Sequence, residues 1–209
     1  MMKRRLLRHD SGASAVEFAL VLPLFLFMLL GLIDVGRWIW TYNRAEKATQ
    51  MGVRQAVVTN GASGTYDPKT NTFTGIYTSY LGSGGLTQGD LIPTGSFGKI
   101  TCDNSSCTCA TTPCPGTLTR NATEFSDIVT RMQKFLPTIA ATNVKVEYST
   151  SGLGYVGNPT GADLAPLVTV RLQGLTFTPT LCLFFGCTLG LPELHSSLTF
   201  EDGRGQQSN

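Results

Sequence analysis

Hydrophobic residues in this chain are concentrated in one uninterrupted run near the N-terminus. Phe18–Ile33 contains sixteen residues, and none of them is charged. Counted from Ala13, the apolar segment has 21 residues; as a helix it is about 31 Å long and spans a hydrocarbon core of roughly 30 Å. The pattern therefore predicts a membrane-spanning helix. Pro23 lies inside it, where it frees one backbone carbonyl, a defect that membrane helices tolerate.

The helix is expected to continue beyond the apolar run. Residues 43–58 contain no proline and mix charged with small residues. Ala45, Ala48 and Gly52 recur at helical spacing and form a stripe of small side chains, which permits close approach of another element. We therefore predict one helix from Ala13 to about Val58, whose second half packs on the chain's own domain.

The distal part of the chain contains short strand patterns separated by Gly-, Ser- and Thr-rich segments. Residues 66–73 are typical of two strand ends around a turn, and Tyr77–Leu91 is expected to be a loop. Val144–Tyr148, Leu167–Leu172 and Leu194–Glu201 alternate apolar and polar residues as half-buried strands do. These patterns predict a small antiparallel sheet.

A second helix is expected from about Thr123 to Leu136. Its apolar residues fall on one helical face, Thr123 is the expected N-cap, and Pro137 ends it. The fold class that follows is α+β: a long N-terminal helix, then a disulfide-containing α+β domain with a small antiparallel sheet.

All six cysteines lie in the distal part, at Cys102, Cys107, Cys109, Cys114, Cys182 and Cys187. An even number confined to an exported region favours disulfides. The pair Cys182–Cys187 is the strongest expectation. Cys102–Cys107 with Cys109–Cys114 is one way to join the rest, although six cysteines allow 15 connectivities. The cluster of four lacks the C-x2-C spacing of zinc ribbons, so no metal site is expected there.

The N-terminal edge of the apolar run carries an unusual combination of residues. Four basic residues come first, and Gly12 and then Glu17 follow at the edge of the run. A secretory signal has its small-residue cleavage site after the apolar stretch, whereas here the small residues come before it. A carboxylate at the edge of a membrane segment is costly unless it has a partner. Retention of the apolar segment and a specific role for Glu17 are therefore expected.

The segment from Gly12 to Pro23 resembles the N-terminus of TadE-like minor pilins or pseudopilins of the tight-adherence (Tad) type IV pilus family, and the likeness continues to about residue 58. The resemblance implies cleavage by a prepilin peptidase between Gly12 and Ala13. Glu17 and Phe18 then become the fifth and sixth residues of the mature chain. In a filament, the Glu17 carboxylate is expected to neutralise the Ala13 amine of a neighbouring subunit.

This resemblance also implies an organisation and a location. We expect a leader at residues 1–12, a transmembrane helix at 13–34, a helical stalk at 35–59, an extracytoplasmic domain at 60–202 and a polar tail at 203–209. The chain would lie in a bacterial inner membrane with its N-terminus cytoplasmic and its domain periplasmic, and could enter a surface pilus. Expected partners are the prepilin peptidase, the major and other minor pilins, the inner-membrane assembly platform and membrane lipid.

Composition and charge exclude several other classes. With 42% apolar and 14% charged residues, the chain is too apolar to be disordered. The net charge of +2 comes from the leader, whose removal leaves 12 basic and 13 acidic residues, so nucleic acid is not an expected partner. No catalytic motif is present, and we expect neither an enzyme nor a cofactor.

Isolated polar residues add little to the functional interpretation. His195 is expected on a strand without a catalytic partner. Asp103–Asn104 and Asp163 are compatible with a calcium ion, but turn chemistry explains them equally well. Asn121–Thr123 matches a glycosylation sequon, yet the threonine is the better helix cap.

The apolar stretch inside the Cys182–Cys187 loop contains Phe184 and Phe185. An exposed cluster of this kind often marks an interface, so we hypothesise that both residues contact a neighbouring subunit. The function predicted from the whole sequence is that of a structural subunit in pilus initiation, assembly or tip formation. A type II secretion minor pseudopilin is the nearest alternative. Two alternatives come from other classes: a signal-anchored bitopic protein with a binding or adhesion domain, and an exported enzyme.

Overall fold

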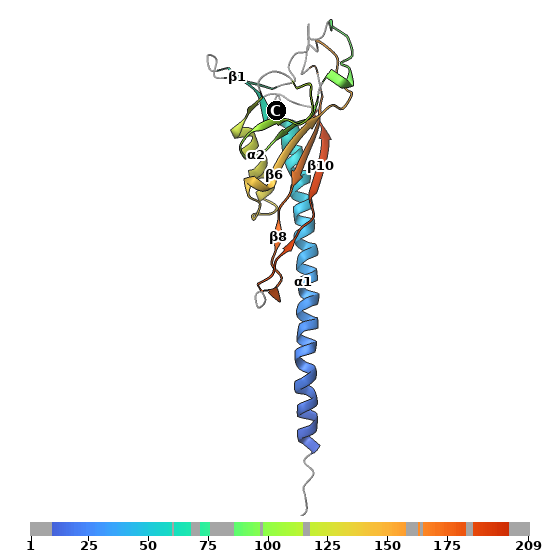
Figure 1. Ribbon diagram of the computed structural model, residues 1–209, viewed down its shortest axis with the longest axis vertical. Coiled ribbons are helices and arrows are strands. Elements are labelled where there is room, and N and C mark those ends of the chain that lie inside the picture. Colours follow the sequence, from blue (N-terminus) through green and yellow to red (C-terminus); the bar gives the residue numbers. More distant parts are fainter. Residues whose placement is uncertain are drawn as a thin grey trace, which may run out of the picture. The chain divides into compact units, whose positions relative to one another are not determined.

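The computed structural model describes residues 10–59, 61–67, 72–75, 86–96, 98–114, 118–157, 163, 165–182 and 186–200. Contacts between residues divide the chain into two units. The first comprises Met1–Thr41 and Thr176–Leu189, and the second comprises Tyr42–Leu175 and Gly190–Asn209. Helix α1 belongs to both units, because it runs without interruption from Asp10 to Val58 (Figure 1).

The predicted long helix is present and begins three residues earlier than expected. It has 49 residues and contains Pro23. Its first half, in the first unit, exposes nearly all of its apolar side chains. Its second half lies in the second unit, where Ala45, Ala48 and Ala56 are completely buried. The change from exposed to buried along one helix is the change that the sequence pattern predicts.

The second unit is built on a five-stranded antiparallel sheet with the strand order β10-β7-β6-β3-β4. The strands are β3 (Ile100–Cys102), β4 (Cys107–Cys109), β6 (Val144–Ser149), β7 (Leu167–Leu172) and β10 (Leu194–Thr199). In the central pair, Val146 lies opposite Val170, and in the outer pair Val170 lies opposite Ser196. The expected strands β6, β7 and β10 are therefore confirmed. The β3–β4 hairpin was not predicted, because each of its strands has only three residues, too few to show an alternating pattern.

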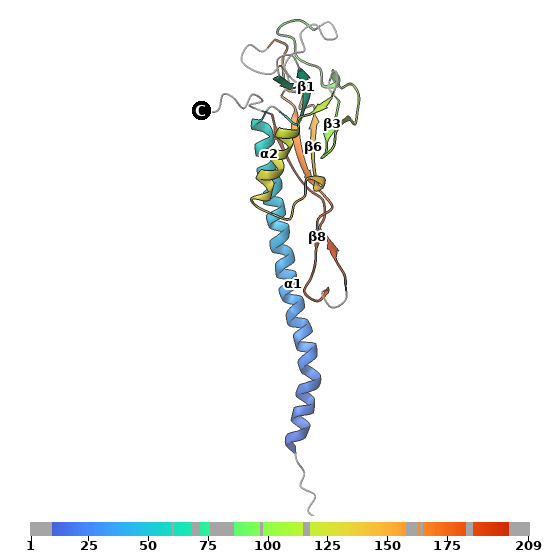
Figure 2. The ribbon, with the colours of Figure 1, turned by 90° about the vertical axis from the view of Figure 1, so that its left-hand side faces the viewer.

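Helix α2 (Ala122–Gln133) and the second half of α1 pack on one face of this sheet (Figure 2). The apolar face predicted for α2 is buried, and it consists of Phe125, Ile128, Val129 and Met132. The predicted N-cap was wrong. Asn121 caps the helix through its side-chain oxygen, which accepts a hydrogen bond from the backbone N–H of Glu124 at 3.3 Å. A cap must precede the first helical residue, and Thr123 is already inside the helix.

Gly52 is the point where α1 meets both other layers of the core. A Cβ at this position would lie 2.8 Å from Cγ of Met132 on α2 and 3.4 Å from Cγ1 of Val170 on β7. The small-residue stripe therefore serves packing within the domain. Tyr148 on β6 completes the core: it is fully buried, and its hydroxyl oxygen accepts a hydrogen bond of 2.7 Å from the backbone N–H of Ala62.

Two smaller sheets complete the described structure. β1 (Ser63–Asp67) pairs with β2 (Thr72–Gly75) and with β5 (Thr119–Arg120), which places the predicted strand ends in an antiparallel hairpin. β8 (Thr176–Phe177) pairs with β9 (Leu189–Gly190). Short 3-10 turns occupy Thr94–Ser96 and Ala141–Asn143. Within the segment Tyr77–Leu91, residues 77–85 lie outside the described residues, as does the tail from 201 onwards.

Candidate functional site

The residues that the sequence analysis assigned to processing and assembly lie at the start of α1. Gly12 and Glu17 are exposed, and no heavy atom lies within 4 Å of the position that a Cβ on Gly12 would take. Ala13 and Glu17 are four residues apart, so they lie on the same face of the helix one turn from each other. Phe18 follows on the surface with 65% of its area exposed. A new N-terminus at Ala13 would have a carboxylate within its first turns.

The apolar half of α1 offers one long exposed surface. From Val16 to Ile33 the large apolar side chains are largely open to the surroundings, and Leu20, Leu24 and Met28 are among the most exposed. In the part of the chain that the structure describes, one helix is long and apolar enough to cross a membrane, and it is this one. Exposed apolar surface of this extent marks contact with a membrane or with protein partners. The helix is thus compatible with a membrane anchor.

A polar cluster around a buried carboxylate lies where the apolar run ends. Asp34 has only 6% of its surface exposed. Its Oδ1 accepts hydrogen bonds from the Thr180 hydroxyl at 2.8 Å and from Nη1 of Arg37 at 2.9 Å. Its Oδ2 accepts a third from the backbone N–H of Leu181 at 3.1 Å. We refer to Asp34, Arg37, Thr180 and Leu181 as the Asp34 cluster.

Arg37 connects the Asp34 cluster to strand β8. Its Nη1 also donates to the Thr180 hydroxyl oxygen at 2.6 Å, and its Cζ lies 5.3 Å from the centroid of the Phe177 ring. Charge, hydrogen bonds and a cation–π contact therefore hold the segment after β8 against α1. The sequence analysis missed this arrangement. An acidic residue directly after the apolar run, with an arginine three positions later, is a signal for a local ion pair, but nothing in the sequence points from there to Thr180.

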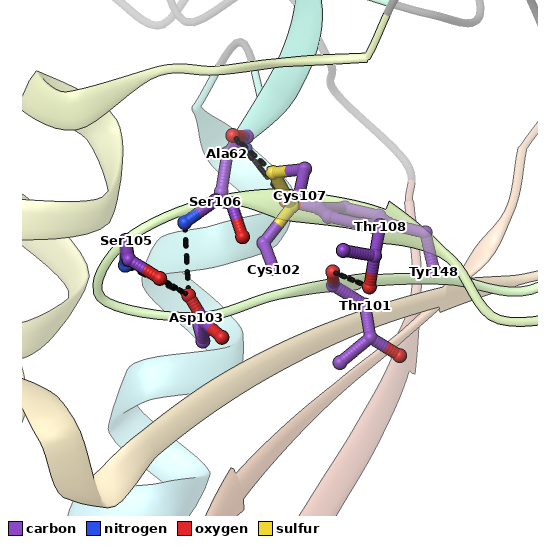
Figure 3. Close-up of a disulfide and its surroundings, with 9 residues drawn as sticks. All are labelled: Ala62, Thr101, Cys102, Asp103, Ser105, Ser106, Cys107, Thr108 and Tyr148. Carbon is purple, nitrogen blue, oxygen red and sulfur yellow. Dashed lines mark hydrogen bonds between the residues drawn. A yellow bond between two sulfur atoms is a disulfide. The ribbon is translucent and has the colours of Figure 1, made fainter.

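The six cysteines form three disulfides: Cys102–Cys107, Cys109–Cys114 and Cys182–Cys187. The first joins directly opposite residues of β3 and β4 and is buried beside Ala62 and Tyr148, with Sγ of Cys107 3.4 Å from the Ala62 carbonyl oxygen (Figure 3). The second lies nearer the surface. The third, Cys182–Cys187, begins directly after Leu181 of the Asp34 cluster. Phe184 and Phe185, the expected interface residues within that loop, lie outside the described residues.

The turn between β3 and β4 explains one of the calcium candidates. Asp103 Oδ1 accepts hydrogen bonds from the hydroxyl and N–H of Ser105, each at 2.7 Å, and from the N–H of Ser106 at 2.9 Å (Figure 3). These hydrogen bonds, with that of the Ser105 hydroxyl as the largest contribution, hold the pKa of Asp103 below its usual range. Asp163 is buried and accepts from the N–H of Gly157 at 3.0 Å. The Asp103 carboxylate thus has a role in a turn, and the Asp163 carboxylate is bound to the backbone of Gly157.

The open face of the five-stranded sheet carries an ion-pair network. Oε2 of Glu147 lies 2.9 Å from Nζ of Lys99 and 2.8 Å from Nε of Arg171, while Nη1 of Arg171 lies 2.7 Å from Oε1 of Glu193. Partial burial alone would raise the pKa of Glu147, but its hydrogen bonds and the two positive charges outweigh this and lower it. His195, on the neighbouring strand β10, is exposed. The arrangement stabilises the sheet and contains no nucleophile paired with a base.

Comparison with known proteins identifies the N-terminal segment. Residues 12–54 match a family model described as TadE-like protein. The match begins at Gly12 and ends within the part of α1 that packs on the sheet. Neither a curated protein nor a solved structure matches the chain. The match is consistent with a TadE-like protein of the Tad pilus system, which is a structural and not an enzymatic class, and suggests a minor-pilin-like protein.

Proposed function

We propose that this chain, with its TadE-like segment at residues 12–54, is a minor pilin or pseudopilin of a Tad-type pilus assembly and secretion system. A prepilin peptidase removes the leader after Gly12, and the mature chain acts structurally in filament initiation, assembly or the tip. The observation that carries this proposal is the continuous helix α1, which combines an exposed apolar half with a buried half. A pilin needs both, because one half contacts other subunits or lipid and the other holds the domain.

The proposed role of Glu17 follows from its position. Before assembly, the exposed carboxylate lies at the edge of the membrane, where it can reach the headgroup layer. After cleavage it lies close to a positively charged Ala13 amine, and the N-terminal end of a helix also favours a negative charge. In a filament, Glu17 pairs with the Ala13 amine of a neighbouring subunit. A charge that is paired and hydrogen-bonded persists in an apolar environment, whereas an unpaired one is strongly disfavoured.

The same proposal gives the location and partners. The basic leader holds the N-terminus in the cytoplasm, so the disulfide-containing domain is periplasmic, where disulfides form. The partners are the prepilin peptidase, other pilins and the inner-membrane assembly platform.

N-terminal sequencing of the membrane-extracted protein tests the processing step. In cells that have the prepilin peptidase, the mature protein should begin at Ala13, and in cells without it the leader should remain. Gly12→Val should block cleavage. Gly31→Val is the matched control, because neither glycine has a heavy atom within 4 Å of a Cβ position, so both variants should fold. An intact leader in every strain contradicts the proposal and favours a signal-anchored binding protein.

Assembly is tested separately with Glu17→Gln in a strain that processes the leader. The variant should reach the membrane and be cleaved, but its amount in the sheared pilus fraction, or its ability to support piliation, should fall strongly. Glu46→Gln, at another exposed position of the same helix, should behave as the unaltered protein. Equal piliation with Glu17→Gln and Glu46→Gln would contradict the role of Glu17.

A further inference from the structure

Residues 176–182 and 186–189 lie beside α1 within the first unit. These two arms are joined by the β8–β9 pairing and by the Cys182–Cys187 disulfide. Figures 1 and 2 both show these arms next to α1, on the stretch that leads from the sheet-bound half toward the apolar half. We call these residues the 176–189 hairpin. The proposed membrane anchor does not by itself explain why a hairpin should extend to this level.

The Asp34 cluster determines the height of the hairpin along α1. Asp34 directly follows Ile33, the last residue of the uncharged run. Because Asp34 accepts hydrogen bonds from Thr180 and Leu181 at 2.8 and 3.1 Å, this part of the hairpin lies level with the end of the apolar run. Asp34 is nearly inaccessible to solvent, so the hairpin covers the helix there.

A second contact gives the height of the paired strands. Arg37, whose guanidinium lies 5.3 Å from the Phe177 ring centroid, is three residues beyond Asp34, or about 4.5 Å further along the helix axis. A hydrocarbon core of roughly 30 Å in a bilayer of roughly 40–45 Å leaves about 5–7 Å of headgroup layer on each side. If residues 13–33 fill the core, the contacts of the hairpin with Asp34 and Arg37 lie within the headgroup layer.

The surface of the hairpin suits that layer. Leu189 on β9 exposes 51% of its surface. Contact with lipid would remove this apolar area from water, which is favourable. Arg37 keeps about half of its side chain accessible and can offer its charge to a lipid phosphate. Leu189 is on the strand paired with β8, and Arg37 contacts Phe177 of β8; apolar side chains together with accessible cations are typical of elements that lie in a membrane interface.

We propose that the 176–189 hairpin is a second membrane contact, held by the Asp34 cluster in the headgroup layer with Leu189 against lipid. This inference rests on the membrane anchor of the proposed function. It gives the first unit two contacts with the membrane, the helix and the hairpin. A neighbouring subunit that covers Leu189 in the membrane-resident protein is the competing outcome.

Photocrosslinking in intact membranes tests the proposal. The photoreactive amino acid p-benzoylphenylalanine replaces Leu189 in the full-length protein and, in separate samples, Leu32 and Leu91. Leu32 lies in the apolar run, whereas Leu91 is a leucine of the second unit with 79% of its surface exposed. After illumination of the membrane fraction, mass spectrometry should find lipid adducts on the proteins labelled at positions 189 and 32, and none at position 91.

The three labelled positions test the hairpin contact and the membrane anchor separately. Lipid adducts at position 32 with none at 189, or with only protein adducts at 189, overturn the hairpin contact and leave the anchor intact. No lipid adduct at either position overturns the anchor and the inference together. With Asp34→Ala added, the lipid adducts at 189 should decrease several-fold while those at 32 stay constant. Unchanged adducts at 189 in that variant would overturn the positioning role of Asp34.

Discussion

The carboxylate of Asp34 and the backbone N–H of Leu181 form a hydrogen bond of 3.1 Å, although the two residues lie 147 positions apart in the chain. Asp34 stands at the end of the apolar run, and Leu181 directly precedes the Cys182–Cys187 disulfide. One carboxylate therefore joins the helix that is compatible with a membrane anchor to a cross-linked loop from the far end of the sequence.

Replacing Asp34 by alanine should release the segment after β8 from the helix. The substitution removes the acceptor for the Thr180 hydroxyl and the Leu181 N–H together, and donors that lose their partner are costly where water is excluded. The Leu181 amide should then exchange its hydrogen about tenfold faster or more, because local opening becomes easier. Hydrogen exchange of the full chain in detergent measures this. Thr180→Val keeps the Leu181 bond and should have a smaller effect, so equal exchange in all three proteins would contradict the prediction.

Gly52→Ala should destabilise the second unit. The new Cβ would lie 2.8 Å from Cγ and Sδ of Met132, which is itself completely buried, so the Met132 side chain or one of the two helices must shift. Overpacking of this kind costs about 1–3 kcal/mol. Gly36→Ala is the control on the same helix, because no atom lies within 4 Å of its Cβ position; it should be neutral or stabilise the helix by up to about 1 kcal/mol.

Hydrogen exchange of the central amides in β6 and β7 distinguishes the two glycine variants, since those amides exchange through large-scale opening of the sheet. Faster exchange in Gly52→Ala alone is the expected result. If both variants exchange as the unaltered protein does, α1 does not approach the core as closely as described.

The two disulfides next to β4 should differ in their contribution to stability. Each disulfide closes a loop with the same sequence separation of 5. Each therefore restricts the unfolded chain to the same extent, which stabilises the fold by about 2 kcal/mol for a loop of this length. Cys102 and Cys107 are buried, and their replacement by alanine also leaves a cavity that adds about 1–2 kcal/mol. Cys109 and Cys114 lie nearer the surface. Denaturant unfolding of the two double alanine variants should show the larger loss for the 102–107 pair.

The ion pairs of Glu147 should make the sheet less stable in acid. The pKa of Glu147 is lower in the folded protein than its ordinary value, so the unfolded chain binds a proton more readily than the folded one. Its contribution to the free energy of unfolding is therefore complete above the unfolded pKa, near 4.3, and decreases as the pH falls through the folded pKa.

Thermal unfolding of the full chain between about pH 6 and pH 3, where carboxylates titrate, tests this sign. Glu147→Gln should be less stable than the unaltered protein at the upper end, because Lys99 and Arg171 lose the negative charge between them. The difference should shrink toward the lower end. A constant difference across this range would show that the ionised form of Glu147 contributes nothing.

Much of this fold can be predicted from local patterns. The apolar run from Phe18 to Ile33 and the small stripe of Ala45, Ala48 and Gly52 determine which parts of α1 are exposed and which are buried, because helical spacing alone assigns residues to faces. Val144–Tyr148 and Leu167–Leu172 were recognisable as strands by their alternation. The resemblance that begins at Gly12 and Glu17 agrees with the family match at residues 12–54.

Other features depended on the tertiary structure. Each strand of the β3–β4 hairpin has only three residues, too few to show a pattern. The hairpin is stabilised because Ile100 and Cys102 are buried in a core that distant strands complete. The cap of α2 was misassigned by two positions, because Asn121 and Thr123 are both good capping residues and only the backbone decides which lies outside the helix.

By itself, the sequence determined the kind of molecule. It is an apolar helix with Gly12 and Glu17 at its N-terminal edge, followed by a cysteine-containing α+β domain. Periodicity, charge and motif spacing are properties of neighbouring residues, so they can be read without coordinates. Only the tertiary structure decided that Asp34 meets Thr180 and Leu181. Such a contact depends on where the chain returns after more than a hundred residues, and no local preference determines that.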